Sequence, residues 1–239
     1  LRIAFELSTT ISERIRNFRL ERLGKIVAGE TPLGKVQAAV LILHLIPVSS
    51  FASPVNYDLP TLLNQARPSL IPMGNPRGWD NFYNFDGIAA IHRIDKLPSY
   101  NSYTQVFRNG IIESACFISN ETKTGENIIS SLVYERTTLQ SLSECLKLQK
   151  HLSIQTPILV MSSLLHVSGC KLYVSERSYR RNNTPIDRDS LIMPEILIDD
   201  FDCNTGKVMK PAFDMVWNAA GYEGSMNYDD KNNWKNDHS

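Results

Sequence analysis

The first clear pattern of apolar and polar positions predicts an amphipathic helix over residues 10–28. Its apolar residues recur at helical spacing and share one face: Ile11, Ile15, Phe18 and Ile26. Thr10 and Glu13 fit a capping box, in which each side chain satisfies a free backbone N–H at a helix start. Gly29 suits a left-handed cap and Pro32 cannot continue a helix, so the pattern predicts the end of the helix here.

Nearly every position of residues 38–46 is apolar, which is typical of a strand buried on both faces. Frequent prolines over residues 47–76 then predict a loop, with one helical turn at residues 61–66. Strands are predicted at residues 85–94, 103–107 and 111–117. Asn109-Gly110 predicts a type I′ hairpin between the last two strands. This register places Val106 opposite Glu113 and would let Arg108 and Glu113 form a diagonal ion pair.

The second half of the chain predicts a long amphipathic helix over residues 126–151, followed by further strands. These strands are expected at residues 158–167 and 171–174, with an edge strand at 196–201. Residues 176–188 read as an exposed polar loop, residues 213–220 as a short helix, and the polar tail from Asn227 as frayed.

This order of elements predicts an α+β fold with a mostly antiparallel sheet. The long amphipathic helix and the N-terminal helix pack on the sheet, and the helices are expected on one side of it. Residues 1–239 are interpreted as one domain, in which residues 1–32 could connect to an upstream domain. The start at Leu1 rather than Met suggests a fragment, a processed chain or an ordered portion, so the sequence leaves open an upstream signal or domain.

Charge and composition narrow the function classes. The chain has 25 basic and 25 acidic side chains, and this balance argues against a globally basic nucleic-acid binder. No apolar run is long enough to span a bilayer, and no export signal is seen, so we expect a cytoplasmic protein without a membrane partner. The four cysteines form no C-x-x-C pair, which favours free thiols over a disulfide framework or a zinc site. No cofactor and no metal ion is expected.

Two arginine clusters are candidate nucleic-acid contacts. Arg14, Arg16 and Arg19 lie on the first helix and could contact phosphates. In the later loop, Arg180, Arg181 and Arg188 lie near Tyr179, a combination suited to phosphate contacts with base stacking. The alternative is a solvated helix face and an ordinary exposed loop. Arg22 falls within the apolar stripe of the helix, so the same alternative pairs it with a carboxylate elsewhere.

Acidic residues offer a different chemistry. Asp86, Glu113 and Asp187 could hold a divalent ion, with Arg108 stabilising developing phosphate charge, as in a metal-assisted nuclease or phosphohydrolase. No spacing among the acidic residues is diagnostic. His44 lies in the most apolar strand, and we interpret it as a hydrogen-bonded core residue. The chain has no P-loop, no dinucleotide-binding fingerprint and no G-x-S-x-G motif.

Several phrases occur together and in order. They are RIRNFRLERLGKIVAGETP (14–32), LHLIPVSSF (43–51), NFDG (84–87), YTQVFRNGIIE (103–113), IDRDSLIMPE (186–195) and PAFDMVWNAAG (211–221). Together they resemble the C-terminal region of bacterial proteins that carry an N-terminal Schlafen AlbA-like domain, often named putative ATP-binding or helix-turn-helix transcriptional regulators. In such proteins the preceding AlbA-like part is associated with nucleic acid or nucleotide binding.

The resemblance singles out a set of mostly polar positions. These are Arg16, Arg19, Arg22, Asp86, Gln105, Arg108, Glu113, Asp187, Arg188, Asp214, Trp217 and Asn218. Six of them, Asp86, Arg108, Glu113, Asp187, Asp214 and Asn218, form the alternative polar site. Such side chains could line one shared site or lock the fold by buried hydrogen bonds.

Three functions therefore stand beside one another. The leading hypothesis is a non-catalytic C-terminal module of a Schlafen AlbA-like protein that aids recognition of nucleic acid, RNA or DNA, or of a protein partner, in regulation or antiviral defence. The second is the metal-assisted nuclease or phosphohydrolase. The third is a structural oligomerisation domain, in which the helix at residues 126–151 or an edge strand forms a homo-oligomer contact.

Overall fold

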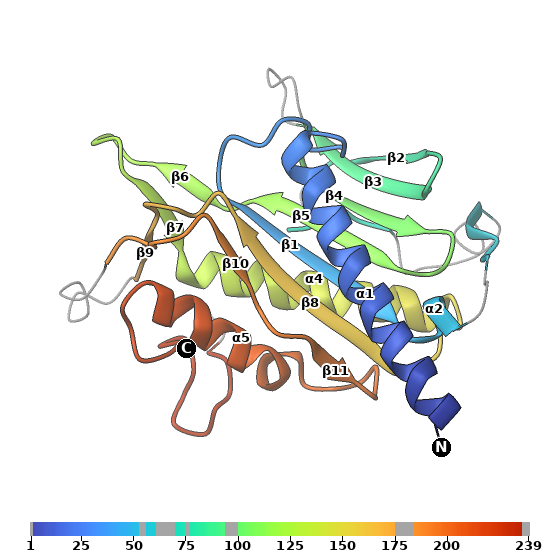
Figure 1. The fold of residues 1–239 in the computed structure, drawn as a ribbon. Coiled ribbons are helices and arrows are strands. Elements are labelled where there is room, and N and C mark those ends of the chain that lie inside the picture. Colours follow the sequence, from blue (N-terminus) through green and yellow to red (C-terminus); the bar gives the residue numbers. More distant parts are fainter. Residues whose placement is uncertain are drawn as a thin grey trace.

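The fold is α+β, built on a mostly antiparallel eight-stranded sheet with helices against it (Figure 1). The computed structural model describes residues 2–52, 56–60, 70–74, 77–93, 100–174 and 184–235. The large sheet has the order β10-β8-β1-β5-β4-β3-β2, and β11 also pairs with β8. Its strands are β1 (Val40–Pro47), β2 (Asp80–Tyr83), β3 (Gly87–Arg93), β4 (Tyr100–Phe107), β5 (Ile112–Phe117), β8 (Ile158–Leu165), β10 (Ser190–Ile192) and β11 (Ile196–Ile198).

The other elements surround this sheet. The helices are α1 (Arg2–Ala28), α2 (Ser49–Ala52), α4 (Ser131–His151) and α5 (Thr205–Ala219). A small second sheet has the order β6-β7-β9, made by β6 (Ser119–Glu121), β7 (Asn127–Ser130) and β9 (Lys171–Tyr173), and β7 and β9 run parallel. The predicted helical turn at residues 61–66 lies outside the described residues, as does most of the predicted loop at 176–188.

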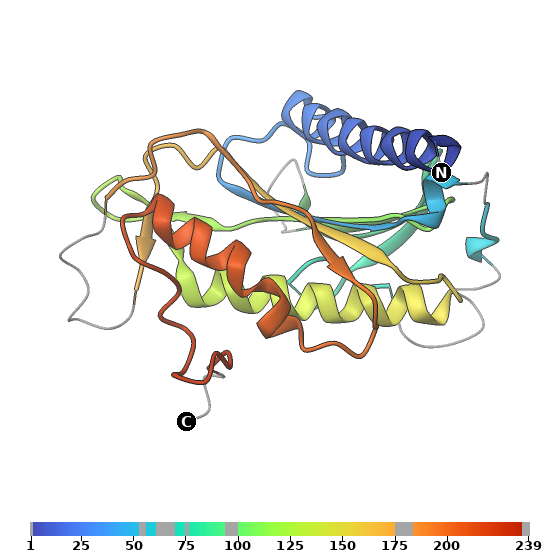
Figure 2. The same cartoon turned by 60° about the horizontal axis from the view of Figure 1, so that its bottom comes forward.

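Strand β1 contributes to the hydrophobic core on both faces of the sheet. It lies between β5 and β8, and all of its residues are buried, as the apolar run predicts. Leu41, Leu43 and Leu45 pack into the core with α4 and α5, whereas Val40 and Ile42 pack with α1. Figure 2 shows α1 on one face of the sheet and α4 with α5 on the other. The expectation that helices lie on one side is therefore wrong, because β1 is apolar at nearly every position and both of its faces must be covered.

The N-terminal helix ends where the sequence predicts but begins earlier. Helix α1 starts at Arg2, so Thr10 lies inside the helix and the capping box predicted from it does not form. At the other end, Gly29 has φ +77°, the Gly29 N–H donates to Ile26 O, and the Glu30 N–H donates to Lys25 O at 2.9 Å. These two bonds are those of a Schellman motif, which satisfies the last carbonyls of a helix.

The hairpin between β4 and β5 has a different turn from the predicted one. Phe107 N–H donates to Ile111 O, and Gly110 N–H donates to Phe107 O, which leaves a three-residue loop with Gly110 at φ +84°. A three-residue loop shifts the register by one residue relative to a type I′ turn. Gln105 therefore lies opposite Glu113, and the predicted ion pair between Arg108 and Glu113 is wrong.

The C-terminal segment is ordered by a buried carboxylate on α4. Glu135 Oε1 accepts hydrogen bonds from Trp217 Nε1 at 2.7 Å and Ser225 Oγ at 2.6 Å. Glu135 Oε2 accepts from Asn227 Nδ2 at 3.0 Å and Trp234 Nε1 at 2.8 Å. The tail from Asn227 to residue 235 is thus fixed against α4 and α5, and the prediction that it is frayed is wrong over this range. Helix α5 is also longer than predicted.

Candidate functional site

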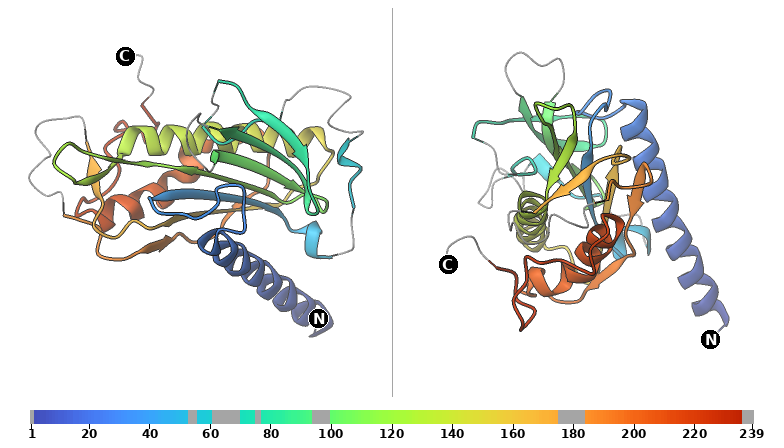
Figure 3. Two further views of the ribbon diagram at one scale, coloured as in Figure 1. Left: turned by 90° about the horizontal axis from the view of Figure 1, so that it is seen from above. Right: turned by 90° about the vertical axis from the view of Figure 1, so that its left-hand side faces the viewer.

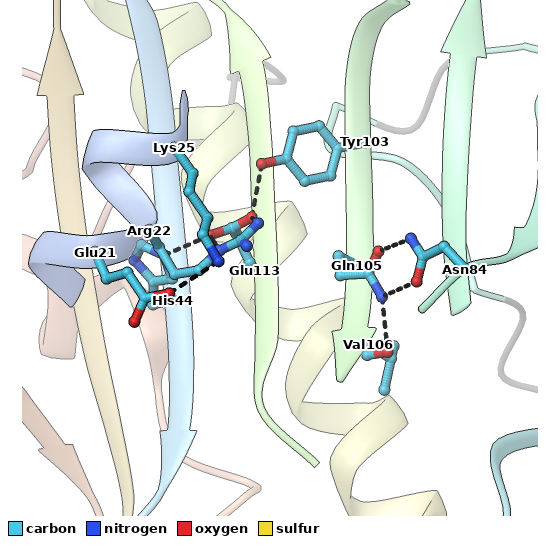
Figure 4. A network of polar contacts seen from close by, with 9 residues as sticks. All are labelled: Glu21, Arg22, Lys25, His44, Asn84, Tyr103, Gln105, Val106 and Glu113. Carbon is cyan, nitrogen blue, oxygen red and sulfur yellow. Dashed lines mark hydrogen bonds and ion pairs between the residues drawn. The ribbon is translucent and has the colours of Figure 1, made fainter. Parts of the chain in front are cut away.

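A buried polar network joins α1 to the centre of the sheet (Figure 4). Glu113 on β5 is fully buried, and Arg22 of α1 donates to both of its oxygens, at 2.9 Å from Nε and 2.7 Å from Nη2. His44 Nε2 lies 2.9 Å from Glu113 Oε2, and the Tyr103 hydroxyl donates to Oε1 at 2.7 Å. The interpretations of Arg22 as a paired residue and His44 as a hydrogen-bonded core residue are confirmed.

The charge of Glu113 is stabilised by its neighbours. Burial alone would raise the pKa of Glu113, but the hydrogen bonds from Arg22 and His44 lower it to about 2. Burial would likewise lower the pKa of Arg22, yet Glu113 raises it overall. Both groups are therefore ionised at neutral pH. Because every oxygen of Glu113 is engaged, the network holds the helix on the sheet and leaves no carboxylate oxygen for a substrate.

Arg19, one turn before, is also committed to the fold. Its side chain is buried, and it donates to Ser163 Oγ, to Met193 O at 2.9 Å and to Ser162 O. Burial lowers the pKa of Arg19 to about 10, against the raising effect of Glu195. A guanidinium in this position links α1 to β8 and to the segment after β10, and it does not reach a phosphate at the surface.

Arg14 and Arg16 remain exposed, but each has an intramolecular partner. Arg14 Nη1 donates to Phe51 O at 2.7 Å, and its guanidinium lies over the Phe51 ring. Arg16 Nε lies 3.5 Å from Glu195 Oε1. Arg188 pairs with the neighbouring Asp187 at 3.0 Å, also at the surface. Arg180 and Arg181 lie outside the described residues.

The carboxylates named for metal-assisted chemistry do not converge. Glu113 is enclosed in the network of Arg22, and Asp187 lies on an exposed segment paired with Arg188. Asp86 lies in an exposed turn, where its backbone carbonyl accepts from Arg108 N. Within the described ranges, no group of three His, Cys, Asp or Glu side chains is placed to hold a metal ion.

Three of the singled-out residues do lie together. Asp187, Arg188 and Asn218 line a cavity of about 580 Å³ between the segment before β10 and the end of α5, with Met193 and Met215 also on its wall. A larger cavity of about 840 Å³ follows α4 and the start of α5; it is lined by Arg136, Gln140, Glu144, Asn204 and Trp234 among others. Asp214 lines neither of these two cavities, and it accepts hydrogen bonds from Lys210 Nζ and from Ser225 N.

Most of the polar positions that the resemblance singles out thus serve the fold. Asn218 Nδ2 donates to Tyr222 O at 2.9 Å and Glu223 O at 2.8 Å, and Trp217 donates to Glu135. Gln105 Oε1 accepts from Asn84 Nδ2 at 2.6 Å (Figure 4). Buried or half-buried groups with satisfied partners are typical of residues that specify a fold.

An exposed aromatic edge is the feature that the sequence did not indicate. Strand β2 is the outer strand of the large sheet at the end opposite β10. Beside it, Trp79, Tyr83 and Phe85 are exposed over 38%, 58% and 95% of their surfaces. Arg77 and Arg108 are also exposed, and Arg108 Nε donates to Phe85 O at 3.3 Å. We call these five residues the aromatic edge.

The turn that carries Phe85 is held firmly. Asn84 Oδ1 accepts from Gly87 N at 2.8 Å, and Arg108 N–H donates to Asp86 O. Gly87 has φ +155°, and a Cβ there would collide with the carbonyl oxygen of Val106. A side chain would therefore not fit at Gly87. Phe85 is thus exposed on a structured turn, and the NFDG phrase (84–87) presents an aromatic side chain to solvent.

The four cysteines are free, as the spacing predicts, and three of them are buried: Cys116, Cys145 and Cys170. Among the described helices, none combines the length and the apolar character needed to cross a bilayer. Comparison with family models, with curated proteins and with solved structures finds no match to this chain.

Proposed function

We propose that this chain is a non-catalytic C-terminal module of a bacterial Schlafen AlbA-like protein, acting in the cytoplasm in regulation or defence, and that its aromatic edge binds single-stranded nucleic acid. The observation that carries the proposal is the exposure of Tyr83 and Phe85 beside Arg108 at the outer strand of the sheet, with Trp79 and Arg77 exposed at the other end of β2. Stacking of bases on aromatic side chains with nearby arginines is the usual way in which proteins bind single strands without sequence preference.

The accessibility of these side chains supports the proposal. An aromatic ring that is 95% exposed gives up most of the stabilisation that burial would provide, and Phe85 keeps that exposure on a structured turn. Aromatic and arginine side chains are also those enriched where proteins bind partners. By contrast, four arginines of α1 are engaged within the chain: Arg14, Arg16, Arg19 and Arg22.

The aromatic edge carries few positive charges, so its binding of nucleic acid should depend only weakly on salt concentration. Among the side chains that the structure describes, Arg77 and Arg108 supply the positive charge of this edge, where Asp80 and Asp86 are also exposed. With about two phosphates neutralised, the logarithm of the binding constant should fall with the logarithm of salt concentration at a slope near −1.4. Stacking rather than charge would then supply most of the affinity.

Fluorescence anisotropy with a labelled single-stranded RNA, a tRNA and a duplex DNA tests the proposal at low and at physiological salt. We expect the single strand to bind most tightly. Phe85→Ala and Tyr83→Ala should each weaken it, by an amount that corresponds to about 1–3 kcal/mol per stacked base. Neither substitution should lower the melting temperature, because both rings are exposed.

Tyr173→Ala is the matched control, since Tyr173 is an exposed aromatic residue on the small sheet, 44% exposed. It should leave binding unchanged. Equal weakening by Tyr173→Ala and Phe85→Ala would contradict a site at the aromatic edge. Absence of binding to all three nucleic acids at low salt would contradict the proposal.

A further inference from the structure

The outer face of α1 carries a feature that the fold does not explain. Leu20, Gly24 and Val27 are spaced four and three residues apart, so they lie on one face of the helix. This face is opposite the one that buries Ile15, Arg22 and Ile26. Leu20 is 60% exposed and Val27 is 51% exposed, and Figure 3 shows α1 along the outside of the molecule.

Among the described residues, nothing in the surroundings of Gly24 requires a glycine. Glycine is among the residues least favourable in a helix interior, because it gains more backbone freedom on unfolding than any other. A Cβ placed at Gly24 would have no atom of the described residues within 4 Å. Its backbone is helical, so no positive φ demands a glycine either. The absence of a side chain leaves a notch in the outer face, between two exposed apolar side chains.

We infer that this face of α1 binds the same face of a second copy of the chain, with the two helices antiparallel. A two-fold axis halfway between Leu20 and Gly24 places Leu20 of each copy in the notch at Gly24 of the other. The face therefore carries both a projection and the hollow that fits it, one helical turn apart, which is the property that an isologous contact requires. Small residues at helix contacts let backbones approach closely.

The charged residues next to this face do not repel a second copy. Lys25 Nζ pairs with Glu21 Oε1 at 2.8 Å, so the charges next to the face cancel within each copy. One helix face buries less surface than a permanent dimer needs, and contacts of this size are weak and reversible. The dimer should therefore form in the micromolar range of concentration. It uses a surface separate from the aromatic edge, so the two proposals stand independently.

Sedimentation velocity over a hundredfold range of protein concentration tests the inference. The wild-type chain should show a reversible monomer–dimer equilibrium, and Leu20→Gln should leave a monomer throughout. Gly24→Ala is the sharper variant, because it should have two opposite effects. It should raise the melting temperature of the monomer by a few degrees as a better helix former. It should also weaken the dimer about tenfold, because the added methyl group fills the notch.

Val133→Gln is the matched control, since Val133 is an exposed apolar residue on α4, 51% exposed. It should leave the equilibrium unchanged. A chain that stays monomeric at every concentration would overturn the inference. A dimer that tolerates both Leu20→Gln and Gly24→Ala would overturn it as well, because the contact would then lie elsewhere.

Cysteine cross-linking tests the antiparallel arrangement directly. In a Cys203→Ser background, which removes the one native cysteine that is not buried, Leu20→Cys and Gly24→Cys chains are mixed and oxidised. The mixed disulfide between the two variants should form faster than either self-linked product. Cross-linking of Leu20→Cys only with itself would indicate parallel helices and would overturn the proposed arrangement.

Discussion

Two buried glutamates stabilise opposite faces of the sheet in different ways. Glu113 faces α1 and has a cation, Arg22, bound to both of its oxygens. Glu135 on α4 faces the C-terminal segment, and the described side chains that donate to it are neutral: two indole N–H groups, a hydroxyl and an amide. Both side chains are fully buried.

Their pKa values move in opposite directions for this reason. Burial raises the pKa of both carboxyl groups. For Glu113 the hydrogen bonds and charges of Arg22 and His44 outweigh burial and lower the pKa to about 2. For Glu135 burial outweighs the four hydrogen bonds, and the pKa is raised. Hydrogen bonds from neutral groups thus compensate a buried charge only in part, whereas a bidentate arginine compensates it fully.

Removing the cation should have the largest effect. Arg22→Met leaves the Glu113 carboxylate buried without its main partner, which should lower the free energy of unfolding by about 3–5 kcal/mol. Urea denaturation measures this loss. The double variant Arg22→Met with Glu113→Gln should recover part of it, because the uncompensated charge is gone. Equal losses in the single and double variants would show that charge is not the cause.

Changing the second carboxylate should have a smaller and more local effect. Glu135→Gln keeps the shape but turns one acceptor oxygen into an NH₂ group, so two of the four donors lose their acceptor. The free energy of unfolding should fall by about 1–3 kcal/mol. Limited proteolysis should cut first within residues 225–235, which these donors hold. Glu144→Gln, on the same helix but paired only with Lys147 in a partly exposed position, is the control and should change stability by less than about 0.5 kcal/mol.

The dependence of stability on pH should also separate the two carboxylates. The folded pKa of Glu113, about 2, lies below the usual 4.5, so its stabilisation is complete above pH 4.5 and is lost as the pH falls toward 2. The folded pKa of Glu135 is raised, so its contribution is complete below pH 4.5 and is lost as the pH rises through the folded pKa. Urea denaturation at a series of pH values from about 2 to 7 measures the contributions of Glu113 and Glu135 to the free energy of unfolding.

Subtracting the stability curve of Glu135→Gln from that of the wild type isolates the second contribution. The difference should decline with rising pH above 4.5. A difference that rises with pH instead would mean that the four donors outweigh burial at Glu135.

The local patterns of the chain were sufficient for much of the fold. The nearly continuous apolar run of β1 predicts a strand in the interior of the sheet. Apolar residues on both faces of a strand are buried only when other elements cover both faces. Gly29 predicts the end of α1, since a left-handed cap favours glycine. Asn109-Gly110 predicts a hairpin, but these two residues do not determine the length of its loop. The loop length depends on packing around the turn, and it decides which residue lies opposite Glu113.

The candidate sites were harder to predict because they depend on residues far apart in the chain. Nothing near Arg22 indicates that its partner is Glu113, ninety-one positions away. Phe85 reads as an ordinary apolar residue until the turn at Gly87 places it in solvent. Local sequence thus determined which segments are helices and strands, because propensity, periodicity and capping act over a few residues. Only the tertiary structure decided which charges are buried and paired and which aromatic and apolar side chains are exposed, because burial depends on contacts between segments.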